Sequence, residues 1–97
     1  MIEGLERRYA LRILLLIHKR GSFKGLSELV KALGVRSFDG PSRALEDLRK
    51  LGLVEVKASE GFPFRVRIEL TELGQKVAEH LAHIEEILAG ARDQEAG

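Results

Sequence analysis

The sequence predicts an α+β fold that is mostly helical, with one β-hairpin placed before the last helix. Three segments that end at Gly21, Gly34 and Gly52 repeat apolar residues at the spacing of about 3.6 that is typical of amphipathic helices. Residues 53–70 instead alternate apolar and polar side chains on both sides of a turn-rich stretch, which is the pattern of two paired strands. The 97 residues, 44% of them hydrophobic, suffice for one domain, and we expect a single domain over residues 1–97.

The first helix is expected over Leu5 to Arg20, with Gly21 as its stop. The residues that share its broad apolar face are Tyr9, Ala10, Ile13, Leu14, Leu16 and Ile17. Leu11 and Leu15 lie on another side, near His18, so the helix carries more apolar surface than one small core requires. We therefore expect a second packing partner for this helix, and we interpret His18 as interfacial rather than catalytic.

The second and third helices are separated by a turn of small and polar residues, Val35 to Gly40. Ser22 to Gly25 form a short linker that could pair briefly as a strand, after which Ser27 can N-cap a short helix that ends at Gly34. Pro41 is expected to start the third helix. The backbone N–H groups of the first helical turn have no acceptor within the helix, so a proline there costs no hydrogen bond. The buried stripe of that helix consists of Ala44, Leu45, Leu48 and Leu51.

The β-hairpin is expected directly after Gly52, whose backbone can turn a helix into a strand without the strain of a Cβ atom. Its first strand covers Leu53 to Ala58, and a loop of about five residues follows from Ser59 to Pro63. The returning strand covers Phe64 to Leu70, with alternating apolar and charged side chains. We call the expected hairpin, residues 53–70, the wing.

The last helix is expected from Thr71, a good N-cap residue, through about Gly90. Gly74 is expected to let this helix approach a neighbour closely, and residues 91–97 are expected to form a frayed tail. Together the elements give the order helix, helix, turn, helix, hairpin, helix. This order is that of a winged helix-turn-helix domain.

Two motifs make the sequence resemble a known family. The third helix ends in Leu51-Gly52-Leu53-Val54, and after the wing the segment Leu70-Thr71-Glu72-Leu73-Gly74 opens the last helix. The sequence resembles winged-helix transcriptional regulators of the MarR and PadR type, as a minimal, archaeal-like single-domain member, over residues 5 to 90. This resemblance implies a regulator that binds double-stranded DNA through the third helix in the major groove and the wing on the backbone or minor groove. The two motifs belong to the scaffold and identify neither operator nor ligand.

The charge distribution supports a nucleic-acid partner. Residues 1–67 carry 14 Lys and Arg against 8 Asp and Glu, a net charge of +6, whereas residues 68–97 carry −5. The basic part is expected to face a polyanion. The predicted DNA contacts of the third helix and the turn before it are Arg36, Ser37, Ser42, Arg43, Arg49 and Lys50. The predicted DNA contacts of the wing are Lys57, Arg65 and Arg67.

Two carboxylates on the third helix oppose strong affinity for DNA, because they repel phosphates. Glu46 or Asp47 can instead accept a hydrogen bond from a cytosine amine or pair with Arg43 or Lys50, and the sequence leaves this open. An alternative function also remains, a winged helix that serves as a protein-interaction module in transcription or replication machinery. Basic side chains on the third helix and wing favour DNA, whereas an exposed apolar face on the third helix would favour a protein partner.

The last helix predicts a homodimer. Val77, Leu81, Ile84 and Leu88 have the 4-3-4 spacing of a coiled-coil seam. A helix of about 20 residues spans roughly 30 Å, which is longer than a small domain needs for its own core. We expect the dimer interface to include this seam together with Leu11 and Leu15. The alternative is a monomer in which the last helix folds back on the first.

Catalytic and metal sites are not expected. The chain has no cysteine, which excludes disulfides, thiol nucleophiles and zinc ribbons. His80 and His83 lie three residues apart without a clear third ligand, and no phosphate-binding or nucleophile motif is present. We therefore expect no enzyme activity, metal or cofactor. A small-molecule effector is not indicated by the sequence and would need a pocket between the first and last helices.

A cytoplasmic protein without a membrane partner is expected. The longest apolar run, Ile13 to Ile17, is far shorter than the roughly 20 residues of a membrane span, and the N-terminus lacks the pattern of a signal peptide. The absence of Asn, Cys and Trp and a charged fraction of 32% favour a thermophilic source.

Overall fold

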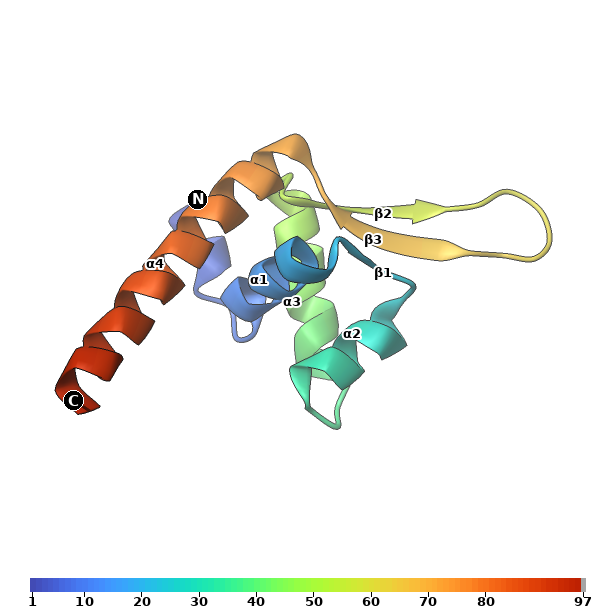
Figure 1. The fold of residues 1–97 in the computed structure, drawn as a ribbon. Coiled ribbons are helices and arrows are strands. Elements are labelled where there is room, and N and C mark those ends of the chain that lie inside the picture. Colours follow the sequence, from blue (N-terminus) through green and yellow to red (C-terminus); the bar gives the residue numbers. More distant parts are fainter. Residues whose placement is uncertain (97) are drawn as a thin grey trace.

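The computed structural model describes residues 1–96 and has the predicted order of elements (Figure 1). The elements are η1 (Ile2–Leu5), α1 (Ala10–Arg20), β1 (Ser22–Phe23), α2 (Leu26–Leu33), α3 (Asp39–Lys50), β2 (Val54–Ala58), β3 (Val66–Leu70) and α4 (Glu72–Ala96). Helices α2 and α3 form the helix-turn-helix, and β2 and β3 form the wing that projects from the body of the molecule. The mostly helical winged-helix fold predicted from the sequence is confirmed.

The sheet has three antiparallel strands in the order β1-β3-β2. Phe23 of β1 lies opposite Ile68 of β3, which lies opposite Val56 of β2. The short linker after the first helix does pair as a strand, so the two-residue β1 covers the edge of the wing next to the body. This pairing fixes the base of the wing against the helices.

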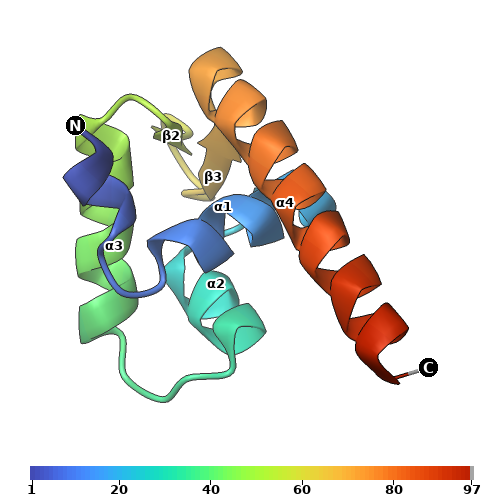
Figure 2. The same ribbon diagram turned by 90° about the vertical axis from the view of Figure 1, so that its left-hand side faces the viewer.

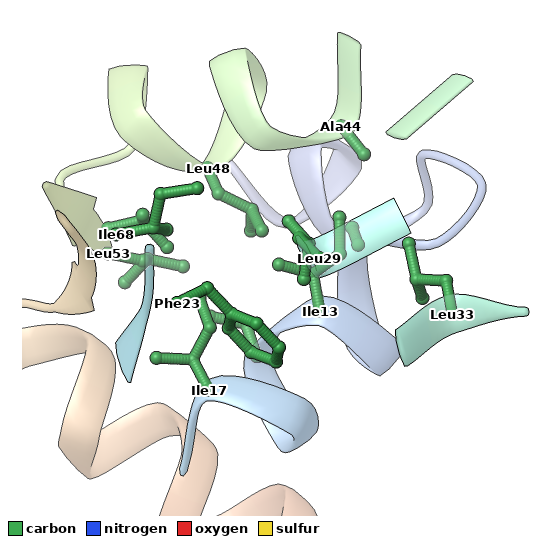
Figure 3. Packing of buried hydrophobic residues seen from close by; sticks show 12 residues of the cluster. Ile13, Ile17, Phe23, Leu29, Leu33, Ala44, Leu48, Leu53 and Ile68 are labelled. Atoms are coloured by element: carbon green, nitrogen blue, oxygen red, sulfur yellow. The ribbon is translucent and has the colours of Figure 1, made fainter. Parts of the chain in front are cut away.

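The core lies where α1 meets α2, α3 and the sheet (Figure 3). Its side chains come from every one of these elements, and Phe23, Ile13, Leu48 and Ile68 are among the largest that are fully buried. Burial of one such side chain stabilises the fold by about 1.5–3 kcal/mol. The core face predicted for the first helix is confirmed at Ala10, Ile13, Leu14 and Ile17.

The first helix begins at Ala10, and the prediction that it starts at Leu5 is wrong. Residues 2–5 form a separate 3-10 turn, and Tyr9 breaks the helix with a left-handed backbone conformation, φ 75°. The Tyr9 ring packs against the start of α3, where a Cβ atom on Gly40 would lie 2.8 Å from it. A tertiary contact therefore overrides the local helical pattern.

Two predicted helix starts also differ from the structure. Helix α2 begins at Leu26, so Ser27 is not its N-cap, and Gly25 occupies that position without a side-chain cap. Helix α3 begins at Asp39, two residues before Pro41. The Ser37 hydroxyl accepts a hydrogen bond from the Asp39 backbone N–H at 3.2 Å, which supports the earlier start.

The loop at the end of the wing is longer than predicted from the sequence. The last strand pair is Ala58 with Val66, so residues 59–65 form a loop of seven residues rather than five. Phe64 was expected in the returning strand but lies in this loop, with 69% of its surface exposed. A hydrogen bond from the Ser59 N–H to the Arg65 carbonyl (2.8 Å) follows the last strand pair in the same register and closes the loop.

The junction of α3, the wing and α4 is tied by Thr71. Its hydroxyl accepts a hydrogen bond from the Gly74 N–H (3.0 Å), which confirms the predicted N-cap, and donates one to the Gly52 carbonyl (2.6 Å). Gly52 has φ 79° and Gly74 allows a close approach, as predicted, since a Cβ there would lie 1.8 Å from the Leu53 carbonyl oxygen. These contacts fix the direction in which α4 leaves the wing.

Helix α4 runs for 25 residues and ends at Ala96, well beyond the predicted end near Gly90. Residues 91–96 are thus helical, not frayed, and Gly97 lies outside the described residues. The first half of α4 packs on α1, and the second half extends away from the other elements (Figure 2). Within residues 1–96, every helix is too short or too polar to cross a membrane.

Candidate nucleic-acid interface

Helix α3 turns one continuous polar stripe outward. Its opposite side buries Ala44 and Leu48 in the core, which fixes the rotation of the helix about its axis. The outward residues recur every three or four positions and are Asp39, Ser42, Arg43, Glu46, Arg49 and Lys50. Four of the six predicted contacts from the third helix and its turn therefore lie together on one solvent-facing surface, which we call the α3 stripe.

Both arginines of the α3 stripe are paired with carboxylates on the same helix. Arg43 Nη2 lies 3.5 Å from Asp39 Oδ2. Arg49 binds Glu46 through two hydrogen bonds, Nε to Oε2 at 2.9 Å and Nη2 to Oε1 at 2.7 Å. The Arg49 hydrogen bond lowers the pKa of the Glu46 carboxyl below its usual value. The sequence left open whether Glu46 pairs with Arg43 or Lys50 or contacts a cytosine, and the structure instead pairs it with Arg49, whose planar guanidinium lies one turn away.

The second carboxylate of concern, Asp47, points away from the α3 stripe. Its Oδ2 accepts a hydrogen bond from Arg7 Nε at 2.6 Å, and its side chain is 27% exposed. Arg7 lies between η1 and α1, forty residues earlier in the sequence, so no local pattern indicated this pair. The pair removes Asp47 from the surface that would meet DNA.

The turn before α3 contains one exposed cation and one structural serine. Arg36 is exposed and makes no ion pair with any described residue. Ser37 has its hydroxyl engaged with the Asp39 N–H. Phe38 is 47% exposed beside them. Arg36 is thus available to a ligand, while Ser37 first serves to shape the turn.

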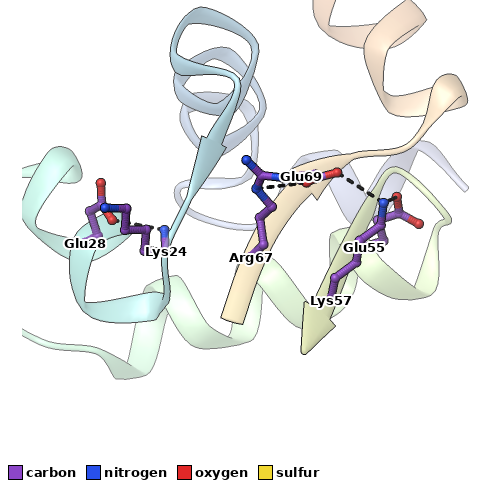
Figure 4. A network of polar contacts seen from close by, with 6 residues as sticks. All are labelled: Lys24, Glu28, Glu55, Lys57, Arg67 and Glu69. Carbon is purple, nitrogen blue, oxygen red and sulfur yellow. Dashed lines mark hydrogen bonds and ion pairs between the residues drawn. The ribbon is translucent and has the colours of Figure 1, made fainter. Parts of the chain in front are cut away.

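The wing cations form a charge network on the outer face of the sheet (Figure 4). Glu55 and Glu69 lie directly opposite each other on β2 and β3. Lys57 Nζ lies 3.4 Å from a carboxylate oxygen of each, and Arg67 Nε lies 3.2 Å from Glu69 Oε1. Hydrogen bonds to Glu69 and then Glu55 raise the pKa of the Lys57 ammonium. Lys57 and Arg67 thus neutralise two carboxylates that would otherwise repel each other.

Arg65 lies farther out, at the end of the wing loop. Its backbone is held by Ser59, whereas its side chain is exposed and has no ion-pair partner among the side chains of residues 1–92. An open groove runs between the wing and the connection from β1 to α2. The charged residues that line it are all cations: Lys24, Lys57, Arg65 and Arg67. No local pattern in the sequence indicates Lys24, because only the pairing of β1 with β3 brings it to the wing.

The predicted dimer residues divide into two groups. Val77 and Leu81 are half-buried and pack on the core of their own domain. Ile84 and Leu88, in the half of α4 that extends away, are 51% and 60% exposed. Ile87, at 57% exposure, joins them, although the seam pattern did not include it.

Leu11 and Leu15, the apolar residues of α1 outside its main core face, line grooves on the two sides of the contact between α1 and α4. Leu11 lies in a groove with Ile2 and Leu81, and Leu15 lies in a second groove with Ala82. His18, near the second groove, joins the two helices, since its Nδ1 lies 3.1 Å from Gln75 Nε2. Among the described residues, no cluster of three or more His, Asp or Glu side chains could hold a metal ion.

No protein-family model matches the sequence, and no curated protein matches it. Solved structures do match the fold. A MarR-family transcriptional regulator from Enterococcus faecalis V583 is 21% identical, with a TM-score of 0.81 over 98% of this chain and 84% of that chain. One from Porphyromonas gingivalis W83 is 27% identical, with a TM-score of 0.74 over 88% of this chain and 81% of that chain. The chain has the winged-helix fold of the MarR regulators.

A transcriptional regulator from Salmonella typhimurium shares the MarR-type fold over 98% of this chain and 83% of that chain, at 20% identity and a TM-score of 0.76. The resemblance inferred from the two scaffold motifs is therefore confirmed at the level of structure. In this MarR-type fold, α3 leads directly into β2, so the α3 stripe and the wing are adjacent along the chain.

Proposed function

We propose that the protein regulates transcription by binding double-stranded DNA, with α3 in the major groove and the wing on the adjacent backbone or minor groove. The observation that carries this proposal is the α3 stripe, an outward row of polar side chains beside a wing that carries three cations. A helix of this kind fits the major groove, and cations on a hairpin can contact the flanking phosphates. The likeness to transcriptional regulators supports the same function.

The ion pairs on the α3 stripe are compatible with DNA binding. Exposed ion pairs contribute little to stability, because water and salt screen them. Arg43 and Arg49 can therefore exchange a carboxylate partner for a phosphate or a guanine edge at small loss. Arg36, Lys50 and Arg65 have no ion-pair partner among the described residues and would meet DNA without any exchange.

We further propose that the protein binds DNA as a homodimer built on α4. The outer half of this helix exposes Ile84, Ile87 and Leu88, which its own domain leaves uncovered. In a second copy, the same face together with Leu11 and Leu15 offers a complementary apolar surface. A two-fold dimer would set two α3 helices about one DNA turn apart, roughly 34 Å, and would favour a pseudo-palindromic site.

The proposal is tested by salt-titrated binding to genomic DNA fragments, followed by fluorescence anisotropy. The affinity should fall by several powers of ten per tenfold rise in salt, because each phosphate contact releases counterions. Arg43→Ala should weaken binding to the selected sequence by about 1–3 kcal/mol, whereas Arg65→Ala should weaken binding to all sequences alike. Absence of binding at low salt, or binding that salt does not change, would instead support a protein-interaction module.

The pairing of Glu46 with Arg49 gives a second prediction. Glu46→Gln removes a negative charge from the α3 stripe and weakens the hold on Arg49, so DNA affinity should rise several-fold at low salt. The matched control is Glu79→Gln, an equal change of charge on an exposed position of α4. Equal effects of the two substitutions on the dissociation constant would show that only net charge matters and that the α3 stripe does not contact DNA.

A further inference from the structure

The tip of the wing carries two exposed phenylalanines. Phe62 is 99% exposed and Phe64 is 69% exposed, both in the loop of residues 59–65. Side chains of this size are normally buried, and the core of this protein lies at the other end of the wing. A partner that covers these two rings would therefore gain binding energy from them.

The loop that carries the two rings is closed by hydrogen bonds. The Ser59 N–H donates to the Arg65 carbonyl at 2.8 Å, and the Arg65 N–H donates to the Ser59 hydroxyl at 2.8 Å. That hydroxyl in turn donates to the Pro63 carbonyl at 3.4 Å. The rings are thus presented at the end of an ordered hairpin, which limits the conformational entropy lost on binding.

The wing is long enough to bring these rings to the floor of a DNA groove. Ile68, which lies opposite Val56, is the buried wing residue nearest the tip, and Phe62 lies six residues from each of the two along the chain. The backbone stays paired for three residues beyond this pair, out to Ser59 and Arg65. At the rise of a strand this distance is roughly 10 Å, and the tip lies beyond it. The minor groove is about 6 Å wide and 7.5 Å deep, so the tip can enter it while the base of the wing stays outside.

The charges around the rings indicate an anionic partner. Four cations line the groove beside Phe64. Two of them, Lys57 and Arg67, offset the carboxylates of Glu55 and Glu69, so Lys24 and Arg65 give this surface its net positive charge. Glu60 is the single carboxylate in loop residues 59–65. Two apolar rings flanked by cations match the combination of base edges and phosphates that lines a DNA minor groove.

We propose that Phe62 and Phe64 act as an apolar wedge that enters the minor groove beside the site of α3, partly unstacks a base step and bends the DNA. This inference rests on the proposed binding of double-stranded DNA and specifies how the wing takes part in it. Pyrimidine–purine steps unstack most easily, so a TpA step should be preferred where the tip contacts the DNA. The wing then adds sequence preference without a hydrogen bond to any base.

The test measures bending by energy transfer between dyes at the two ends of a duplex of about 30 base pairs, or three turns, selected by the wild-type protein from a random pool. The wild type should bring the ends closer together. The double variant Phe62→Ala with Phe64→Ala should bind roughly tenfold more weakly and leave the duplex straight, with the salt dependence unchanged because the cations remain. The control is Leu73→Ala, which removes another exposed apolar side chain, at the start of α4, and should bend DNA like the wild type.

A second measurement uses only the wild-type protein. Fluorescence of 2-aminopurine placed at the contacted step should rise on binding, because unstacking relieves its quenching, and replacing TpA by ApA there should lower affinity. A straight duplex with quenched 2-aminopurine, or a double variant that bends DNA like the wild type, would overturn the wedge and leave DNA binding intact. A change of sedimentation without a change of bending would show that the rings contact another copy instead. A wild type that binds no duplex would overturn the wedge and the proposed function together.

Discussion

Replacing Ile84 and Leu88 together with glutamate is expected to give a folded monomer that has lost about hundredfold or more in affinity for a two-fold DNA site, because one half-site supplies half of the contacts. Both side chains are more than half exposed, so glutamate should be tolerated in the single chain. At a dimer interface the same substitutions would bury like charges close to the two-fold axis. The change therefore separates association from folding.

The choice of positions depends on the structure. Leu81 belongs to the same predicted seam, but it packs on its own core, and glutamate there would destabilise the domain as well. Sedimentation and DNA binding should be measured for wild type, for the double variant and for Ile84→Glu alone. Ala89→Glu, on another side of the helix, is the matched control and should remain dimeric. If the wild type itself sediments as a monomer at tens of micromolar and protects a single half-site, the dimer proposal is wrong.

Gly74→Ala is expected to lower the free energy of unfolding by about 3 kcal/mol or more, which could prevent folding altogether. The new Cβ would lie 1.8 Å from the Leu53 carbonyl oxygen. That oxygen cannot move away freely, because it accepts a hydrogen bond from the Thr71 N–H at 3.0 Å. Helix α4 would have to shift away from the wing, and the Thr71 bond to Gly52 would be strained with it.

Urea unfolding followed by circular dichroism measures this effect, and Gly90→Ala provides the control. Gly90 lies in the same helix, and a Cβ added there would meet no atom within 4 Å, so alanine should raise stability by about 0.5–1 kcal/mol through helix propensity. Equal stability of Gly74→Ala and the wild type would show that α4 does not pack against Leu53 as described.

The sequence by itself determined the order of the elements and most of the core. The helical spacing of apolar residues identified the buried faces of α1 and α3. The switch to alternating apolar and polar residues after Gly52 identified the wing. Gly52 and Thr71 marked the two ends of the wing correctly, because a left-handed turn and an N-cap are local requirements of the backbone. Such features depend on neighbours within a few residues, so a single sequence contains the information.

Only the tertiary structure decided which partners those faces meet. The break at Tyr9 comes from a ring that packs on Gly40, and the Arg7 pair with Asp47 joins residues forty positions apart. Spacing placed Val77 and Ile84 on one seam of α4, but α1 covers only the first part of that seam, and the rest extends away from the domain. The physical reason is that periodicity defines the apolar face of a helix, whereas the length of the neighbouring helix decides how much of that face is covered.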